Sequence, residues 1–463
     1  MASSRAISPG VDLQIGLAGR RQRAALEDEL RDAVRAGRLR PGSRLPSSRS
    51  FADELGIARN TVADAYAQLI AEGWLVARHG AGTWVAERPD ARPDTRSLGA
   101  AEARRPRFDL RPGLPDLGSF PRSAWLSAAR RALALASDES LGYGGPRGLT
   151  VLREALADYL SRARRVATGP ERIVVCAGFA EALRLLCGVM RGRGASTLAV
   201  EAFGQPLYWA IIEASGLTAR FIPIDCAGAV TDDLDTNTGA ALLTPAHQFP
   251  LGVALNPARR RHAIAWAADT GSIVIEDDYD GEFRYDRQAI GAMQSLAADH
   301  VVYAGTASKS LAPGVRLAWL ALPASLMDEV IEAKRSLGSF PAALDQLIFA
   351  EFLASGGFDR HVRRVRIAYR RRRERLLTYL SRGEQRVDVS GIAAGLHAIV
   401  HLGDRTEREV IDRAAEHGLA LEGVGDYTAP GHAHPAALVI GYATPPAHTY
   451  SAALARLVAV LSA

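Results

Sequence analysis

The chain has 463 residues, 48% of them hydrophobic and 23% charged, and its formal net charge is +5. This length predicts two or three domains, and the small net charge means that affinity for nucleic acid must come from local basic patches. Three widely spaced cysteines suggest neither a disulfide framework nor a CxxC metal site, as expected in a reducing cytosol. The chain has no apolar run of about 18 residues and begins without a signal-peptide core. We therefore expect a cytoplasmic protein with no membrane partner.

The first 86 residues predict a small helical domain followed by a hairpin. Apolar residues at helical spacing predict three helices, over 20–36, 47–55 and 59–72. Gly56 lies in a tight turn between the second and the third, which makes the pair a helix-turn-helix. In such a pair the N-terminal residues of the second helix lie on base edges in the major groove. Here those residues are Arg59, Asn60 and Thr61.

A more specific signal in this segment is the pattern RLPSSR…LGIARNTV…L..EG…G.GT.V. It resembles the winged helix-turn-helix of the GntR family over essentially the whole segment, so we expect a DNA-binding domain over 11–86. The resemblance implies that Arg49, Arg59 and Thr61 contact operator DNA and that Arg44 contacts a phosphate. The tip of the wing, with His79 and Gly80, would lie at the adjacent minor groove. The alternative is a generic helical module with a solvated basic face.

Residues 106–463 alternate short apolar runs with helical stretches, after a segment at 87–105 whose composition predicts a flexible linker. Buried strands are predicted at 172–176, 197–200, 241–244, 272–275 and 301–304. Helices are predicted between them, for example at 149–160, 181–190 and 259–269. This alternation indicates an α/β fold with a mainly parallel sheet covered on both faces. Ligands of such folds bind beyond the carboxyl ends of the strands.

One of those strand ends carries an unusual lysine. The chain has 56 lysines and arginines, but only Lys309 and Lys334 are lysines. Arginine stays protonated and cannot replace lysine where chemistry needs a deprotonatable amine. Lys309 is therefore a candidate Schiff-base lysine, and Thr306, Ser308 and Arg316 beside it suit a phosphate. The alternative is that two lysines persist by chance in an arginine-biased sequence.

Two further strand ends carry complementary groups. In SIVIEDDYDGEF, alternation along the strand places Asp277 and Tyr279 on one face. A carboxylate there can hold a protonated ring nitrogen, and a phenol can bind a ring oxygen. The alternatives are a solvated acidic strand end or a divalent metal site, although no histidine lies at ligand spacing. In CAGFAEALRLL, Gly178 precedes a helix whose first amides, of Phe179 and Ala180, can seat a phosphate.

Together these groups suit pyridoxal 5′-phosphate (PLP), with a lysine for the aldehyde and an acid for the pyridinium nitrogen. The stretches RPGLPDLGSFPRSAW, YGGPRGLTVLREALADYL, TPAHQFPLG, IEDDYDGEFRY and GTASKSLAPGVRLAW resemble fold-type-I aminotransferases, in the same order. Joined to a GntR-like head, the chain resembles the MocR-type regulators.

The resemblance assigns a role to each matching residue. It implies that Lys309 forms the Schiff base, that Asp277 pairs with the ring nitrogen and that Tyr279 approaches the ring hydroxyl. The phosphate would be held by Thr306, Ser308, Arg316 and the amides of Gly178, Phe179 and Ala180. His247 or Gln248 would lie near the ring oxygen. Tyr143 would reach the phosphate of a neighbouring subunit, which implies a homodimer, and a small α+β subdomain would begin near residue 350.

Two positions depart from the family pattern. Gln205 stands where a tyrosine usually stacks on the cofactor ring, and Val439 stands where an arginine usually binds the α-carboxylate of an amino acid. An α-carboxylate without that arginine loses a charge-assisted contact of ~1.5–3 kcal/mol. We therefore expect a regulator, associated with the bacterial nucleoid when bound to DNA, that senses PLP, an amine or an amino acid. The alternative is an active aminotransferase with a DNA-binding head.

Overall fold

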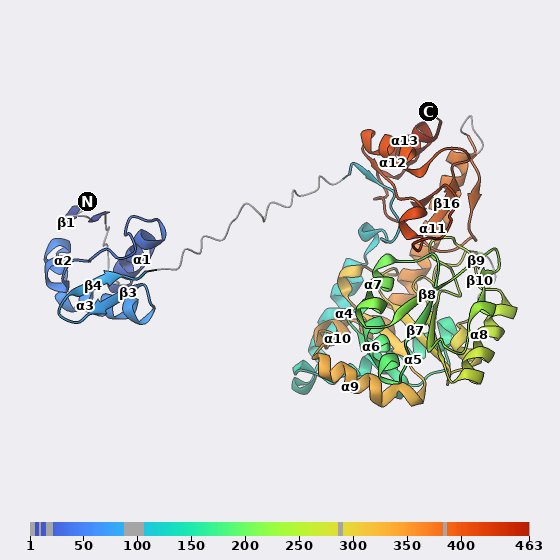
Figure 1. Ribbon diagram of the computed structural model, residues 1–463, viewed down its shortest axis with the longest axis horizontal. Helices are drawn as coiled ribbons and strands as arrows, with labels where there is room; N and C mark the ends of the chain where they lie inside the picture. The colour runs from blue at the N-terminus through green and yellow to red at the C-terminus, as the bar shows by residue number, and fades with distance from the viewer. Residues whose placement is uncertain are drawn as a thin grey trace. The chain divides into compact units, whose positions relative to one another are not determined.

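The computed structural model of the protein describes residues 5–8, 11–14, 22–87, 106–285, 290–382 and 387–462. The chain forms two compact units, Met1–Arg104 and Arg105–Ala463 (Figure 1). The predicted linker at 87–105 lies outside the described residues, apart from Glu87. None of the helices in the described ranges is both long and apolar enough to cross a membrane.

The first unit is a three-helix domain with a hairpin. Its elements are β1 (Arg5–Ser8), β2 (Val11–Gln14), α1 (Gln22–Arg35), α2 (Ser48–Leu55), α3 (Arg59–Ala71), β3 (Leu75–Arg78) and β4 (Gly82–Val85). Leu26 and Leu30 of α1 pack with Phe51 of α2 and Val62 and Leu69 of α3 in one buried core. The antiparallel pair β1–β2 was not predicted.

The turn between α2 and α3 has the local chemistry of a helix-turn-helix. The Ser47 side chain caps α2 by accepting a hydrogen bond of 3.1 Å from the Ser50 backbone N–H. Gly56 ends α2 in the left-handed region, at φ 66°, which glycine adopts without a steric cost. The chain then re-enters a helix at Arg59, so the start of α3 lies directly after the turn.

A seven-stranded sheet forms the centre of the second unit, in the order β6-β14-β13-β12-β11-β7-β8. These strands are β6 (Ile173–Cys176), β7 (Thr197–Glu201), β8 (Thr218–Ile222), β11 (Ala240–Leu243), β12 (Ile273–Asp277), β13 (Val301–Thr306) and β14 (Ala318–Ala321). Only β14 runs antiparallel to its neighbours. The predicted α/β class with a mainly parallel sheet is confirmed, whereas β8 and β14 were not predicted.

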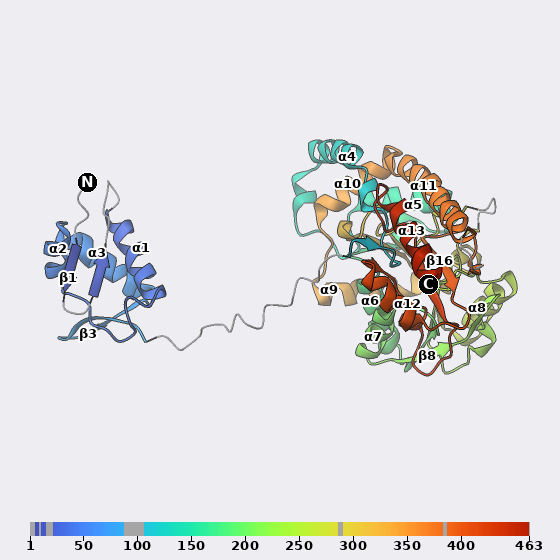
Figure 2. The ribbon, with the colours of Figure 1, turned by 90° about the horizontal axis from the view of Figure 1, so that it is seen from above.

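Helices cover both faces of the sheet (Figures 1 and 2). They are α4 (Arg122–Leu135), α5 (Thr150–Arg164), α6 (Phe179–Gly192), α7 (Pro206–Ala214), α8 (Pro257–Thr270), α9 (Met327–Leu337) and α10 (Ala343–Ala354). Val174 and Val302 face the core beneath α6 and α7, whereas Ile173 and Tyr303 face the core beneath α5 and α10. Strands buried on both faces explain the near-continuous apolar runs in the sequence.

A smaller layer contains the end of the chain. Its elements are β5 (Phe108–Asp109), α11 (Gly357–Leu380), β15 (Val389–Ser390), β16 (His397–His401), α12 (Glu407–Glu416), β17 (Leu419–Ala420), β18 (Ala437–Gly441) and α13 (Tyr450–Ser462). β15, β16 and β18 form an antiparallel sheet. β5 pairs with β17, so the start of this unit lies against its C-terminal elements (Figure 1). The short pair β9 (Ile224–Asp225) and β10 (Gly228–Ala229) flanks the large sheet.

A buried ion pair fixes the end of β12, the central strand. Arg164, at the end of α5, donates to both carboxylate oxygens of Asp278, at 2.6 and 2.9 Å. The Tyr303 hydroxyl donates to the same carboxylate at 2.8 Å. All three side chains are buried. Because the pair is buried and bidentate, removing one partner leaves an uncompensated charge in the core.

We predict that Arg164→Met lowers the free energy of unfolding of the second unit by about 3–5 kcal/mol. The matched control is Arg162→Met on the same helix, which removes an exposed ion pair with Asp359 and should cost at most about 1 kcal/mol. Urea denaturation followed by tryptophan fluorescence measures both. Equal effects of the two substitutions would contradict the role assigned to Arg164.

Candidate functional site

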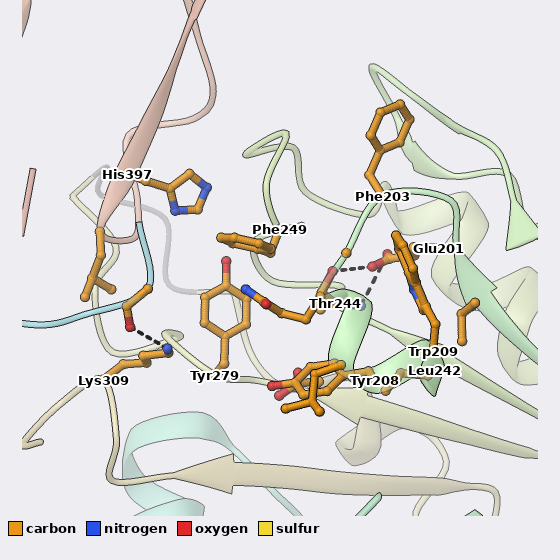
Figure 3. Close-up of a pocket in the computed structure, with 17 residues that line it drawn as sticks. Glu201, Phe203, Tyr208, Trp209, Leu242, Thr244, Phe249, Tyr279, Lys309 and His397 are labelled. Carbon is orange, nitrogen blue, oxygen red and sulfur yellow. Dashed lines mark hydrogen bonds between the residues drawn. The ribbon is translucent and has the colours of Figure 1, made fainter. Parts of the chain in front are cut away.

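The carboxyl ends of β7, β11, β12 and β13 meet at one edge of the sheet, and a cavity of about 270 Å³ lies there. Its wall carries the polar side chains of Glu201, Asp277, Tyr279, Lys309 and His397 (Figure 3). Its apolar wall consists of side chains that include Phe203, Trp209, Leu242 and Phe249. His397 comes from β16, so both the large sheet and the smaller layer contribute to the cavity.

Lys309 points into this cavity from the loop after β13 (Figure 3). Its Nζ donates a hydrogen bond of 2.6 Å to the backbone oxygen of Gly113. Burial lowers the pKa of Lys309, and the carboxylates of Asp280 and Asp277 oppose that shift only in part. A lysine with a lowered pKa is more often unprotonated and can attack an aldehyde.

The acidic run at the end of β12 and just after it resolves into separate pairs. Glu276 accepts two backbone N–H groups, at 2.7 and 2.9 Å. Asp278 binds Arg164, and Asp280 lies 2.9 Å from Nδ1 of His247. Within the described ranges, no group of three His, Cys, Asp or Glu side chains could hold a metal ion. The divalent-metal alternative therefore gains no support.

Asp277 is the acid of this run without a partner. Its carboxylate is buried, lines the cavity, and makes no hydrogen bond or ion pair with any described residue. Burial, followed by the nearby carboxylate of Asp278, raises the pKa of Asp277 well above its usual range. Such a group gains most from a bound cation, and a protonated ring nitrogen is one.

Tyr279 lines the cavity beside Asp277, as strand alternation predicts. Its hydroxyl lies 3.1 Å from Nδ1 of His247. Neither His247 nor Gln248 belongs to the main cavity wall. The Gln248 side-chain amide instead donates to the backbone oxygen of Phe203 at 2.8 Å, which holds the loop in place. His247 is thus connected to the cavity through the Tyr279 hydroxyl. Phe249, the residue after Gln248, lines the cavity wall itself.

The predicted phosphate residues form a second cluster next to the cavity. Gly178 precedes α6 at φ 113°, and a Cβ there would lie 3.2 Å from Nη1 of Arg316. The Arg316 guanidinium has no hydrogen bond or ion pair with any described residue. The hydroxyls of Thr306 and Ser308 lie 3.0 Å apart. A free guanidinium, two hydroxyls and the start of a helix together suit a dianionic phosphate.

The second lysine of the chain supports this cluster, which the sequence analysis missed. Lys334 is fully buried, and its Nζ donates at 2.8 Å to Glu181, in the first turn of α6. The other carboxylate oxygen of Glu181 accepts the backbone N–H of Ala177, just before Gly178. The rarity of lysine in this chain was the signal that could have identified Lys334.

The structure shows where the two residues that depart from the family pattern, Gln205 and Val439, lie relative to the cavity. Gln205 lines the cavity at the start of α7, and Tyr208, one turn later, lines it as well. The ring of Tyr208 contacts that of Phe179, with centroids 4.9 Å apart. Val439 is buried in the core and does not face the cavity. Among the described residues, no arginine lines this wall.

Tyr143 lies away from the cavity of its own chain, with its side chain 99% exposed. Other exposed apolar side chains of the second unit include Leu114, Leu117, Leu126, Leu133, Leu135, Leu141 and Val151.

The first unit carries a candidate DNA surface. Arg49, Arg59 and Asn60 are exposed on α2 and α3, and Arg44 is exposed before them. None of these four side chains makes a hydrogen bond or ion pair with a described residue. Thr61 is half-buried, and His79 and Gly80 are exposed at the turn between β3 and β4.

The arginines of α1 differ, because they pair with acids of their own unit. Arg23 binds Glu27 at 2.7 Å, and Arg31 binds Glu72 at 2.9 Å. Their charge is already neutralised, whereas the charge at the start of α3 is available to a polyanion.

Comparisons with known proteins agree with this division. Residues 22–85 match the model of the bacterial regulatory proteins of the gntR family, and residues 111–457 match that of aminotransferase class I and II. The probable rhizopine catabolism regulatory protein MocR of Rhizobium meliloti is 30% identical over 413 residues, which cover 84% of each chain. The chain belongs to the MocR-type transcription regulators. Another relative of this type is the pyridoxine biosynthesis transcriptional regulator PdxR of Corynebacterium glutamicum, which is 33% identical over 411 residues, 87% of this chain and 88% of that protein.

Solved aminotransferases share the fold of the second unit. An archaeal alanine:glyoxylate aminotransferase superposes with a TM-score of 0.69 at 22% identity, over 76% of this chain and 90% of that one. Kynurenine aminotransferase of Pyrococcus horikoshii superposes with a TM-score of 0.69 at 23% identity, over 79% of this chain and 93% of that one. The predicted MocR-type organisation is thus confirmed. PLP is the cofactor of the aminotransferase class I and II family, and the unpaired Asp277 and the space kept by Gly178 fit that group.

We predict that Gly178→Ala weakens PLP binding by at least about tenfold, because alanine is strained at this φ and its Cβ displaces Arg316. Pyridoxal, which lacks the phosphate, should bind the variant and the wild type alike. Gly188→Ala on the same helix is the control, because a Cβ there meets nothing within 4 Å. Tryptophan quenching measures these affinities. An equal loss for pyridoxal would contradict a phosphate seat at Gly178.

Proposed function

We propose that this chain is a PLP-dependent, DNA-binding transcription regulator. The observation that carries the proposal is that Asp277, a buried carboxylate without a partner, faces the same cavity as Lys309. Lys309 would hold the aldehyde carbon of PLP as a Schiff base, which makes the cofactor able to exchange with an amine. Asp277 would hold the ring nitrogen and Tyr279 the ring hydroxyl. Gly178, Phe179, Ala180, Thr306, Ser308 and Arg316 would hold the phosphate.

The head, at 11–86, would bind operator DNA, and residues 106–463 would sense PLP itself, an amine or an amino acid. The four unpaired side chains on the surface of the first unit support the DNA contact. The full exposure of Tyr143 supports a homodimer, in which two heads would read two half-sites. A protein that binds operator DNA would work in the bacterial cytoplasm, at the nucleoid. Regulation is favoured over transamination because no described arginine lines the cavity.

Lys309→Ala should abolish the visible absorption that lysine-bound PLP gives, because alanine offers no amine. Lys309→Arg is the control: it keeps the positive charge but cannot condense with an aldehyde, so it should lose the band as well. Absorption spectra of the purified proteins after PLP addition measure this. A band that survives in either variant would reject Lys309 as the attachment point.

Arg59→Ala should reduce the preference for operator over random DNA, with a lost bidentate base contact costing ~1–3 kcal/mol. Arg23→Ala on α1 is the matched control, because Arg23 is exposed but paired with Glu27. Fluorescence anisotropy with operator and scrambled duplexes at fixed salt measures both. Operator affinity unchanged in Arg59→Ala would reject the start of α3 as the reading surface.

A further inference from the structure

With PLP in the cavity, the wall would carry one negative side chain more than the ligand and the other side chains neutralise. Among the described residues, the charged side chains that line the cavity are Lys309, Asp277 and Glu201. Lys309 would be bonded to the aldehyde carbon, and Asp277 would be paired with the protonated ring nitrogen. His397 adds no charge, because burial lowers its pKa to about 3. A single carboxylate, that of Glu201, is therefore left without a counter-charge.

Glu201 ends β7 and is buried, with 7% of its surface exposed. Its carboxylate accepts hydrogen bonds from the hydroxyl and the backbone N–H of Thr244, and a long one, 3.4 Å, from Gln248. These donors are neutral, so they orient the carboxylate without cancelling its charge. Burial raises the pKa of Glu201 to about 7. A cation that reached this carboxylate would relieve the cost of its burial.

The position of Glu201 separates it from the reactive end of the cavity. β7 lies three strands from β13 in the sheet, and Lys309 follows β13. In Figure 3 the two side chains lie at opposite sides of the cavity, with Tyr279 and Phe249 between them. Leu242 and Trp209 line the same cavity, and their apolar side chains suit a hydrocarbon chain. A ligand that reaches both ends thus needs an apolar middle.

We propose that the effector cavity recognises diamines: one amino group lies at the Lys309 end and a second, protonated amino group binds the carboxylate of Glu201. This inference rests on the proposed function and adds the chemical class of the effector. The same cavity disfavours an acidic effector. A carboxylate at the far end would meet Glu201, a like charge, and no described arginine. The position of Val439 in the core removes the partner that an amino acid would need.

The test compares three ligand classes on the PLP-loaded wild-type protein, at chain lengths of three to six carbons: diamines, monoamines and ω-amino acids. Titrations follow both the visible spectrum and the heat of binding. At its best chain length, the diamine should bind at least about tenfold more tightly than the monoamine, the factor that a charge-assisted hydrogen bond supplies. The ω-amino acid should bind most weakly. No diamine preference at any length, or a preference for the ω-amino acid, would overturn the proposal.

Glu201→Gln keeps the shape of the side chain and its acceptor oxygen but removes the charge. It should bring the diamine-to-monoamine affinity ratio close to one and leave the monoamine affinity unchanged. Glu213→Gln, on the exposed side of α7, is the control for an equal loss of charge outside the cavity. If PLP gives no visible band with the wild type, the proposed function itself fails. An intact band with an unchanged ratio in Glu201→Gln rejects only the diamine site.

Discussion

The structure depends on one buried carboxylate, that of Asp277, which has no partner among the described residues although other acids lie beside it. The end of β12 and the residues directly after it carry four acids in five residues. Each acid other than Asp277 has a partner: two backbone amides for Glu276, Arg164 for Asp278 and His247 for Asp280. Asp277 alone turns into the cavity. Because an unpaired buried carboxylate is costly, this arrangement is best explained by a bound cation, which the pyridinium nitrogen of PLP would supply.

The cluster around Gly178 and Arg316 shows the same feature, a charged group that is left available to a ligand. Arg316 has no hydrogen bond or ion pair with a described residue. The turn that faces it is held from behind by Glu181 and Lys334. Under the proposed function, Lys309 would form the Schiff base, whereas Lys334 supports this turn through Glu181. The support lies in a buried pair, where a compact ammonium group fits and a planar guanidinium would need more room and more acceptors.

The two domains and most of the cavity residues were predictable from the sequence. Strands buried on both faces appear as apolar runs, and a helix-turn-helix is marked by its capping residues and its glycine turn. The convergence of Asp277, Tyr279 and Lys309 followed from parallel-strand topology. Other features did not follow, and three of them bear on the site. β14 runs antiparallel, which an apolar run does not indicate. Gln248 binds backbone oxygens, and Lys334 meets Glu181 across 153 residues. Each is set by tertiary packing, which no local pattern encodes.

The cavity also explains how a sensor can keep an aminotransferase scaffold while changing its task. A catalyst must bind one substrate carboxylate through every step, whereas a sensor needs only a ligand that binds one arrangement of its layers better than another. Glu201 ends β7 and Lys309 follows β13, so both belong to the large sheet and its loops. His397 begins β16 of the smaller layer, and Leu396 lies just before it. A ligand in this cavity contacts both layers. Under the proposed function, the difference in its affinity for two arrangements of these layers would set how far it shifts the equilibrium between them.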